Sequence, residues 1–143
     1  MRVATTSLAL ALALAFAAAA AVSTATAAPT ATARSSTAEL DAESKVLKGT
    51  WVRPDGGYTI VIANGAAGGQ LEATYFNPRQ LPFARAEASR QGSDLRVFLE
   101  LRAGGYDGST YDLRYDPASD RLTGVYYQAV AKQKYDIFFV RKN

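Results

Sequence analysis

Tyrosine is the most abundant side chain of this sequence that could contact a ligand. The 143-residue chain contains eight tyrosines and neither histidine nor cysteine. Without imidazole or thiol groups, serine–histidine and cysteine–histidine catalysis are excluded, and so are the zinc sites that those side chains build. A phenol combines a large apolar ring with a hydroxyl that donates or accepts a hydrogen bond. The composition therefore favours a binding surface, and we expect no enzyme activity, no metal and no cofactor.

The candidate ligand-binding residues are four tyrosines and one arginine. They are Tyr58, Tyr75, Tyr111, Tyr126 and Arg85. Arg85 is the candidate anchor for an anion, with Glu87 or the ligand as its partner, because an unpaired buried guanidinium is costly. Ala84, Ala86 and Ala88 alternate with these charges. If the alanines point inward they leave room for a ligand, and if the charged face does, Arg85 and Glu87 are buried as a pair. Packing of aromatic rings in a protein core explains the same tyrosines.

The charged residues suggest no further chemistry. Asp107, Asp112, Asp116 and Asp120 fall in expected turns or on a solvent face, not in a convergent pair of the kind that glycosidases use. No phosphate-binding or dinucleotide-binding glycine motif is present. The formal net charge is +3 and its lysines and arginines are dispersed. Nucleic-acid binding, which requires clustered positive charge, is therefore not expected.

The N-terminal segment has the pattern of a secretion signal. Arg2 precedes an apolar run over Leu8–Val22, and Ala25-Thr26-Ala27 fits a signal-peptidase site. We expect residues 1–27 to be removed before Ala28, with residues 31–33 as a second possible site. The run is shorter than the ~20 residues of a membrane span, so we expect an exported protein in the periplasm or the medium, without a membrane anchor. Residues 28–36 are small and polar, which predicts a disordered tether.

A short helix is expected next, over residues 37–48. Ser36 and Glu39 have the spacing of a capping box, Leu40 and Leu47 share one face, and Gly49 ends the segment.

From Gly49 onward the hydrophobic period changes to two, which predicts strands. Eight such runs are separated by glycine, proline, asparagine and aspartate turns. The runs are Gly49–Arg53, Tyr58–Ala63, Gln70–Phe76, Phe83–Arg90, Leu95–Arg102, Thr110–Tyr115, Arg121–Gln128 and Lys134–Arg141. Several have one apolar and one polar face, so the sheet must close or pack on another sheet. Residues 37–143 are therefore expected to form an all-β domain, an eight-stranded antiparallel up-and-down β-barrel with a short N-terminal helix. A two-sheet sandwich is the alternative.

The order of these elements resembles the calycin barrels, which include lipocalins, fatty-acid-binding proteins and avidins. The similarity lies in a helix, then Gly49-Thr50-Trp51, then a meander that ends in Arg141, and Leu122–Tyr126 is similar to an avidin strand. The resemblance implies that Trp51 lies near the closed end of the barrel with Arg141 packed over it. The biotin-binding pattern of avidins does not map onto this chain, so biotin binding is not implied.

Strand alternation in a meander places the helix, Trp51 and Arg141 at one end. The other end then carries the longer links, including 77–82 and 103–109, and a rim of mixed charge. The rim residues are Arg53, Arg79, Lys132, Lys134, Asp55 and Asp107. Because loops and barrel mouths commonly bind ligands, we expect any ligand inside the barrel at this end.

Two functions remain open on the sequence. The first is a lipocalin-like or avidin-like binding protein that holds a small apolar, aromatic or anionic molecule in the barrel mouth. The second is a secreted or periplasmic interaction protein, such as an inhibitor of an exported enzyme, that acts through its loops. A roomy pocket favours the first, and a filled interior favours the second.

Overall fold

The computed structural model describes residues 31–143, with side chains from residue 36 onward. The expected signal peptide, residues 1–27, lies outside this part of the chain, as does the start of the expected tether. None of the helices found in residues 31–143 is long and apolar enough to cross a membrane.

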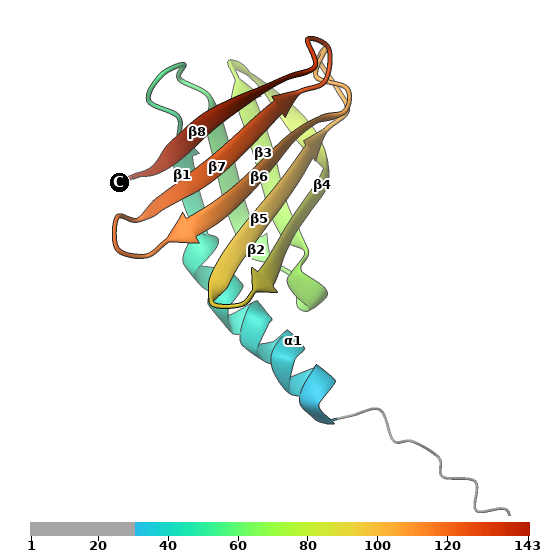
Figure 1. The fold of residues 1–143 in the computed structure, drawn as a ribbon, viewed down its shortest axis with the longest axis vertical. Coiled ribbons are helices and arrows are strands. Elements are labelled where there is room, and N and C mark those ends of the chain that lie inside the picture. Colours follow the sequence, from blue (N-terminus) through green and yellow to red (C-terminus); the bar gives the residue numbers. More distant parts are fainter. Residues whose placement is uncertain (1–30) are drawn as a thin grey trace, which may run out of the picture.

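Eight antiparallel strands form one closed barrel in chain order (Figure 1). They are β1 Gly49–Val52, β2 Thr59–Gly65, β3 Leu71–Asn77, β4 Arg79–Gln91, β5 Asp94–Leu101, β6 Ser109–Asp116, β7 Arg121–Gln128 and β8 Gln133–Lys142. Every strand pairs with its neighbours in sequence, and β8 pairs back with β1. The predicted up-and-down barrel is confirmed, and the sandwich is excluded.

The helix α1 spans Ala31–Ser44 and continues into a 3₁₀ turn, η1, over Lys45–Leu47. It begins earlier than the sequence indicated, within the segment expected to be a tether. Ser36 therefore lies inside the helix and is not its N-cap, so the predicted capping box is wrong. The alanine-containing stretch from Ala31 has enough helix propensity to extend the helix backward. The expected end is confirmed, because β1 starts at Gly49.

The barrel interior is filled by alternate residues of the strands. In β5, Leu95, Val97, Leu99 and Leu101 are all buried, as their shared face predicted. Trp51 is fully buried, and its indole Nε1 donates a 2.8 Å hydrogen bond to the carbonyl oxygen of Leu47. The end of η1 is thereby tied to the first strand.

A β-bulge in β4 changes which face of that strand points inward. The register between β4 and β5 shifts between Phe83 and Arg85, so Ala84 is the extra residue. Phe83 packs against the core on one side of the bulge, and Ala86 and Ala88 are buried on the other. The simple alternation that grouped Ala84 with the other two alanines is therefore wrong, and Phe83 shares the inner face instead.

Candidate binding site

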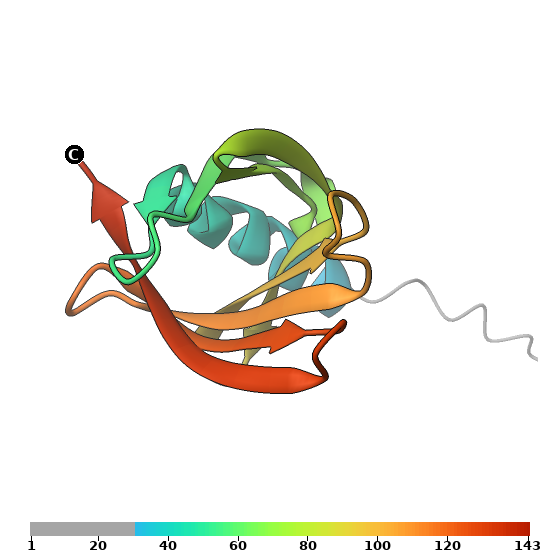
Figure 2. The same cartoon turned by 90° about the horizontal axis from the view of Figure 1, so that it is seen from above.

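The two ends of the barrel are built differently. The end covered by α1, here called the closed end, also carries the short 3₁₀ segment η2 (Ala67–Gly69) and the β4–β5 and β6–β7 turns. The opposite end, here called the mouth, carries the β1–β2, β3–β4, β5–β6 and β7–β8 links. Figure 1 shows the mouth at the top with α1 below the barrel, and Figure 2 looks down on the mouth. We expect a ligand at the end that no helix covers.

Arg141 holds the closed end together. Its guanidinium carbon lies 4.2 Å from the centre of the Trp51 ring, as predicted, and β-pairing places the two residues opposite each other. The same guanidinium donates to the carbonyl oxygens of Val46 (2.7 Å) and Lys48 (2.6 Å), and it forms an ion pair with Asp120. Arg141 therefore links η1, β1 and the β6–β7 turn, and its donors are committed to structure.

Polar contacts of Asp41 fix the helix α1 to η2. Asp41 Oδ1 accepts hydrogen bonds from the backbone N–H groups of Gly68 (3.2 Å) and Gly69 (3.4 Å) in η2. Gly69 has a φ of +81°, and a Cβ there would meet the carbonyl oxygen of Ala88 at 2.3 Å, so only glycine fits. These contacts position the helix across the end of the barrel.

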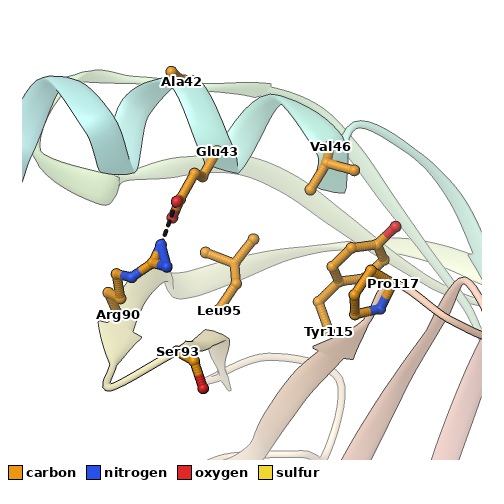
Figure 3. A pocket seen from close by; sticks show the side chains of 8 residues that line it. All are labelled: Ala42, Glu43, Val46, Arg90, Ser93, Leu95, Tyr115 and Pro117. Atoms are coloured by element: carbon orange, nitrogen blue, oxygen red, sulfur yellow. Dashed lines mark hydrogen bonds and ion pairs between the residues drawn. The ribbon is translucent and has the colours of Figure 1, made fainter.

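A groove of about 310 Å³ remains between α1 and the two hairpin turns (Figure 3). Its lining consists of Ala42, Glu43, Val46, Arg90, Ser93, Leu95, Tyr115 and Pro117. An ion pair between Glu43 and Arg90 crosses it and lowers the pKa of the glutamate. Oε2 of Glu43 is buried without a hydrogen-bond partner. The groove has a single phenol, that of Tyr115, in its lining, so it offers an aromatic ligand fewer ring faces than the mouth does.

The mouth contains a pocket of comparable volume with a different lining. It also measures about 310 Å³, at the lower end of the range for small-molecule sites. Its lining residues are Arg53, Tyr58, Tyr106, Tyr126, Gln128 and Tyr135. One guanidinium, four phenols and one amide therefore converge at the end where the sequence predicted a ligand.

Strand register explains why so many rings meet there. Tyr111, Tyr126 and Tyr135 lie opposite one another on β6, β7 and β8, and directly paired residues project on the same face of a sheet. The rings of Tyr111 and Tyr126 stack with centroids 4.6 Å apart, and those of Tyr126 and Tyr135 are 6.2 Å apart. The three rings form a ladder that runs from the core to the rim of the mouth.

Two of the predicted ligand-binding tyrosines lie below the pocket and not in its wall. Tyr75 and Tyr111 are fully buried, and the hydroxyl of Tyr111 donates to that of Tyr75 at 3.5 Å. Burial raises the pKa of Tyr75, and it raises the pKa of Tyr111 to about 12. Both phenols therefore stay neutral in the folded protein. The interior is thus filled, which by itself favours an interaction protein. A ligand at this end would lie on top of these rings, in the mouth, and not deep inside the barrel as expected.

Arg53 is the cation of the pocket. Its guanidinium carbon lies 4.6 Å from the centre of the Tyr58 ring, and Nε is 2.5 Å from Oδ1 of Asp55. This ion pair raises the pKa of Arg53 and lowers that of Asp55. Asp55 belongs to the same turn and is 61% exposed, so an incoming anion could replace it.

Arg85, the predicted anion anchor, lies on the outer wall of the barrel. It forms an ion pair with Glu87 at 2.7 Å, packs over Phe98 and is 54% exposed. Because Ala86 and Ala88 point inward, the alternative in which Arg85 and Glu87 are buried as a pair is wrong, and the two side chains are paired on the outside. The structure brings Tyr58 and Tyr126 into the pocket wall and leaves Arg85 away from it.

Sequence reasoning placed Arg53 on the rim but did not select it as the anchor. It also did not select Tyr106, Gln128 or Tyr135. For Tyr135 a signal was present, because its register opposite Tyr126 follows from the hairpin between β7 and β8. Tyr106 lies in the β5–β6 link, where alternation gives no orientation, and contacts Tyr75 edge-on at 5.7 Å.

Comparison with known proteins adds no identity to this geometry. No protein-family model matches the chain, and neither a curated protein nor a solved structure matches it. The fold is therefore stated as a closed eight-stranded antiparallel barrel, and the function rests on the mouth pocket alone.

Proposed function

We propose that this is an exported, non-catalytic binding protein, similar to lipocalins and avidins in its architecture, that holds a small aromatic anion in the barrel mouth. The observation that carries the proposal is the convergence of Arg53 with four tyrosines on one pocket of about 310 Å³. Tyrosine faces bind a planar ring, their hydroxyls bind its polar substituents, and a guanidinium binds a carboxylate.

The position of Asp55 refines the chemistry of the ligand. Its carboxylate already occupies two donors of Arg53, on Nε and Nη2. A carboxylate on the ligand could replace Asp55 in one or both of these hydrogen bonds, because it carries the same charge. A neutral ligand would replace a charged acceptor by a weaker one and would gain no binding energy. We therefore expect this site to bind a carboxylic acid more tightly than the corresponding amide. Asp55 competes with the carboxylate of the ligand for the same two donors of Arg53.

The test uses 4-hydroxyphenylacetate, which combines a phenol and a carboxylate, and its neutral amide. In ¹H–¹⁵N NMR titrations we expect the acid to shift the signals of Arg53, Tyr58, Tyr126 and Tyr135, and to bind at least ten-fold more tightly than the amide. Arg53→Gln should abolish that preference, whereas Asp55→Asn should strengthen binding of the acid several-fold.

Arg96→Gln is the matched control. Arg96 also pairs with an aspartate, Asp112, at 2.6 Å, but on the outer wall. It should leave the titration unchanged. Equal binding of acid and amide, or an Arg53→Gln protein that binds the acid like the wild type, would contradict the proposal. So would signals that do not move at millimolar probe.

A further inference from the structure

The wall of the barrel is incomplete beside the mouth. β1 pairs with β8 only at Thr50, Trp51 and Val52, opposite Lys142, Arg141 and Val140. After Val52 the chain leaves the sheet at Arg53-Pro54 and turns into β2. Residues 133–139 of β8 therefore pair with β7 on one side and, among residues 31–143, with no strand on the other. In an antiparallel strand alternate backbone groups face each side, so this edge presents open N–H and C=O groups.

Exposed apolar side chains gather at the same edge. Val130, in the β7–β8 link, is 73% exposed, and Tyr135 and Phe138 on β8 are 41% and 39% exposed. Among residues 36–143 the only other large hydrophobic side chain exposed to this degree is Val46, at the closed end. Isolated exposed hydrophobic residues need no explanation, but two of them on β8 and one in the link before it lie along the edge that β1 leaves open, which indicates an interaction edge.

The open edge is continuous with the mouth pocket. Tyr135 belongs to β8 and also lines the pocket, with Arg53 from the β1–β2 link among the other lining residues. Lys132 and Lys134 stand at the same end of β8, and neither takes part in an ion pair within the described side chains. These two lysines outweigh Asp136, the one acid on this part of the strand, while the charge of Arg53 is balanced by Asp55. A second copy of the chain would bring the same lysines to this edge, so charge favours an acidic partner.

We propose that an extended, acidic segment of a partner protein adds to the edge of β8 and inserts an acidic side chain into the mouth pocket, beside Arg53. Backbone hydrogen bonds to residues 133–139 would supply affinity, and the anchored carboxylate would supply specificity, as in other cases of strand addition. The anchoring step rests on the proposed function, because it uses the same pocket and the same cation. The strand addition does not.

The probes are synthetic heptapeptides of alternating threonine and valine with a central glutamate, blocked at both ends. One variant carries lysine in place of glutamate. Two others keep the glutamate and are N-methylated, one at the odd positions and one at the even positions. We expect the glutamate peptide to shift the amide signals of residues 133–139 together with those of Arg53 and Tyr58. The lysine peptide should bind at least ten-fold more weakly.

N-methylation distinguishes strand addition from contact through side chains alone. Only alternate N–H groups of an added strand face β8, so one methylated peptide should bind like the parent and the other at least ten-fold more weakly. Lys134→Gln should weaken the glutamate peptide a few-fold. Lys142→Gln is the matched control, because Lys142 lies where β1 already covers β8, and it should have no effect.

Equal binding of both methylated peptides would overturn the inference, and so would the absence of shifts in residues 133–139 at millimolar peptide. A homodimer, detected by light scattering, whose formation shifts the signals of residues 133–139 would overturn it as well. The 4-hydroxyphenylacetate titration separates the two proposals. If that acid binds and the peptides leave the edge unchanged, the strand-docking inference fails and the proposed function stands. If the peptides shift the edge signals while the acid does not bind, the pocket proposal fails and the edge remains a docking site.

Discussion

Each end of the barrel carries one arginine stacked on one aromatic ring, and the two arginines are committed differently. Arg141 lies over Trp51 and bonds to two backbone carbonyls and to Asp120, which belong to separate elements. Arg53 lies over Tyr58, and its ion pair is with Asp55, two residues further along the same turn. Removing Arg141 would remove the hydrogen bonds and the ion pair that link η1, β1 and the β6–β7 turn. Arg53 can exchange its ion-pair partner without losing a contact between separate elements.

This difference shows how one residue type serves stability at one place and recognition at another. A guanidinium whose donors satisfy backbone groups cannot be released without leaving those groups unpaired. The Arg53 side chain is itself only 14% exposed, but its ion-pair partner is an exposed carboxylate and its guanidinium donates to no backbone carbonyl within residues 31–143. Exchange of that partner therefore leaves no backbone group unpaired. The predictions below address the two ends in order of expected effect.

The largest effect is expected at the closed end. Trp51→Ala should lower the free energy of unfolding by about 3–5 kcal/mol, because a fully buried indole and its hydrogen bond to Leu47 are lost. Tyr135→Ala, at the mouth, should cost less than about 1 kcal/mol because that ring is 41% exposed. Urea unfolding of both variants measures the two losses. Similar losses would contradict the division between a structural and a binding end.

Alkaline pH should act through the tyrosines under the mouth. The pKa of Tyr111 is raised to about 12 and that of Tyr75 is raised as well, both by burial. The unfolded chain ionises near pH 10 while these phenols keep their protons, so the unfolded state binds fewer protons and stability falls as pH rises. From pH 9 to pH 11 the two groups together should cost about 2–3 kcal/mol.

Urea unfolding at pH 9, 10 and 11 measures this loss. The Tyr75→Phe protein cannot lose a proton at that position, so from pH 9 to pH 11 it should lose about 1.4 kcal/mol less than the wild type. A slope unchanged by the substitution would show that Tyr75 ionises equally in both states.

Arg141→Gln should cost about 2 kcal/mol, because the carbonyl oxygens of Val46 and Lys48 lose a charged donor. Arg121→Gln is the matched control: Arg121 also lies over a ring, that of Phe138 at 5.0 Å, but on the exposed outer face. It should cost less than about 0.5 kcal/mol. Thermal and urea unfolding should agree on this order, and a reversed order would show that the closed end does not depend on Arg141.

The smallest effect on stability is expected for Arg53→Gln, at less than about 1 kcal/mol. The Arg53 side chain is 14% exposed, but its ion pair with Asp55 is local and its guanidinium donates to no backbone carbonyl of the described residues. Its loss should therefore cost less than that of Arg141. A loss as large as that of Arg141→Gln in the same urea experiment would mean that Arg53 is structural.

The fold could be predicted from the sequence because local signals agreed with one another. Alternation in segments such as Leu95–Arg102, together with explicit turn residues, located all eight strands, and short links fixed their order. Counting strand directions placed Trp51 and Arg141 at the same end, the resemblance to calycin barrels implied their contact, and the register between β1 and β8 confirms it. A pocket at the mouth was expected from the same count of strand directions and is present, although a groove of equal volume lies at the closed end.

The side chains of the site were harder to predict. The bulge at Ala84 arises from the fit of β4 to β5, which no local pattern reveals, and it is why alternation grouped Ala84 with the inward alanines of β4. Tyr75 and Tyr111 belong to the tyrosine cluster but lie too deep in the barrel to line the pocket. The depth of a residue in the barrel depends on the tilt of the strands, which the sequence does not reveal. Arg53 gave no signal that set it apart from the other rim charges, since its contact with Tyr58 exists only in the folded turn.

The most direct test of the division between the two ends measures stability and binding together. Urea unfolding of the wild type, Arg141→Gln and Arg53→Gln proteins is compared with and without 4-hydroxyphenylacetate at a concentration about 100 times its dissociation constant for the wild type. A ligand that binds only the folded state stabilises it by about 2.7 kcal/mol under that condition. We expect the wild type and the less stable Arg141→Gln protein to gain this full increment, and the stable Arg53→Gln protein to gain at most half of it. An increment retained in Arg53→Gln, or lost in Arg141→Gln, would contradict the assignment of binding to the mouth and of structural support to the closed end.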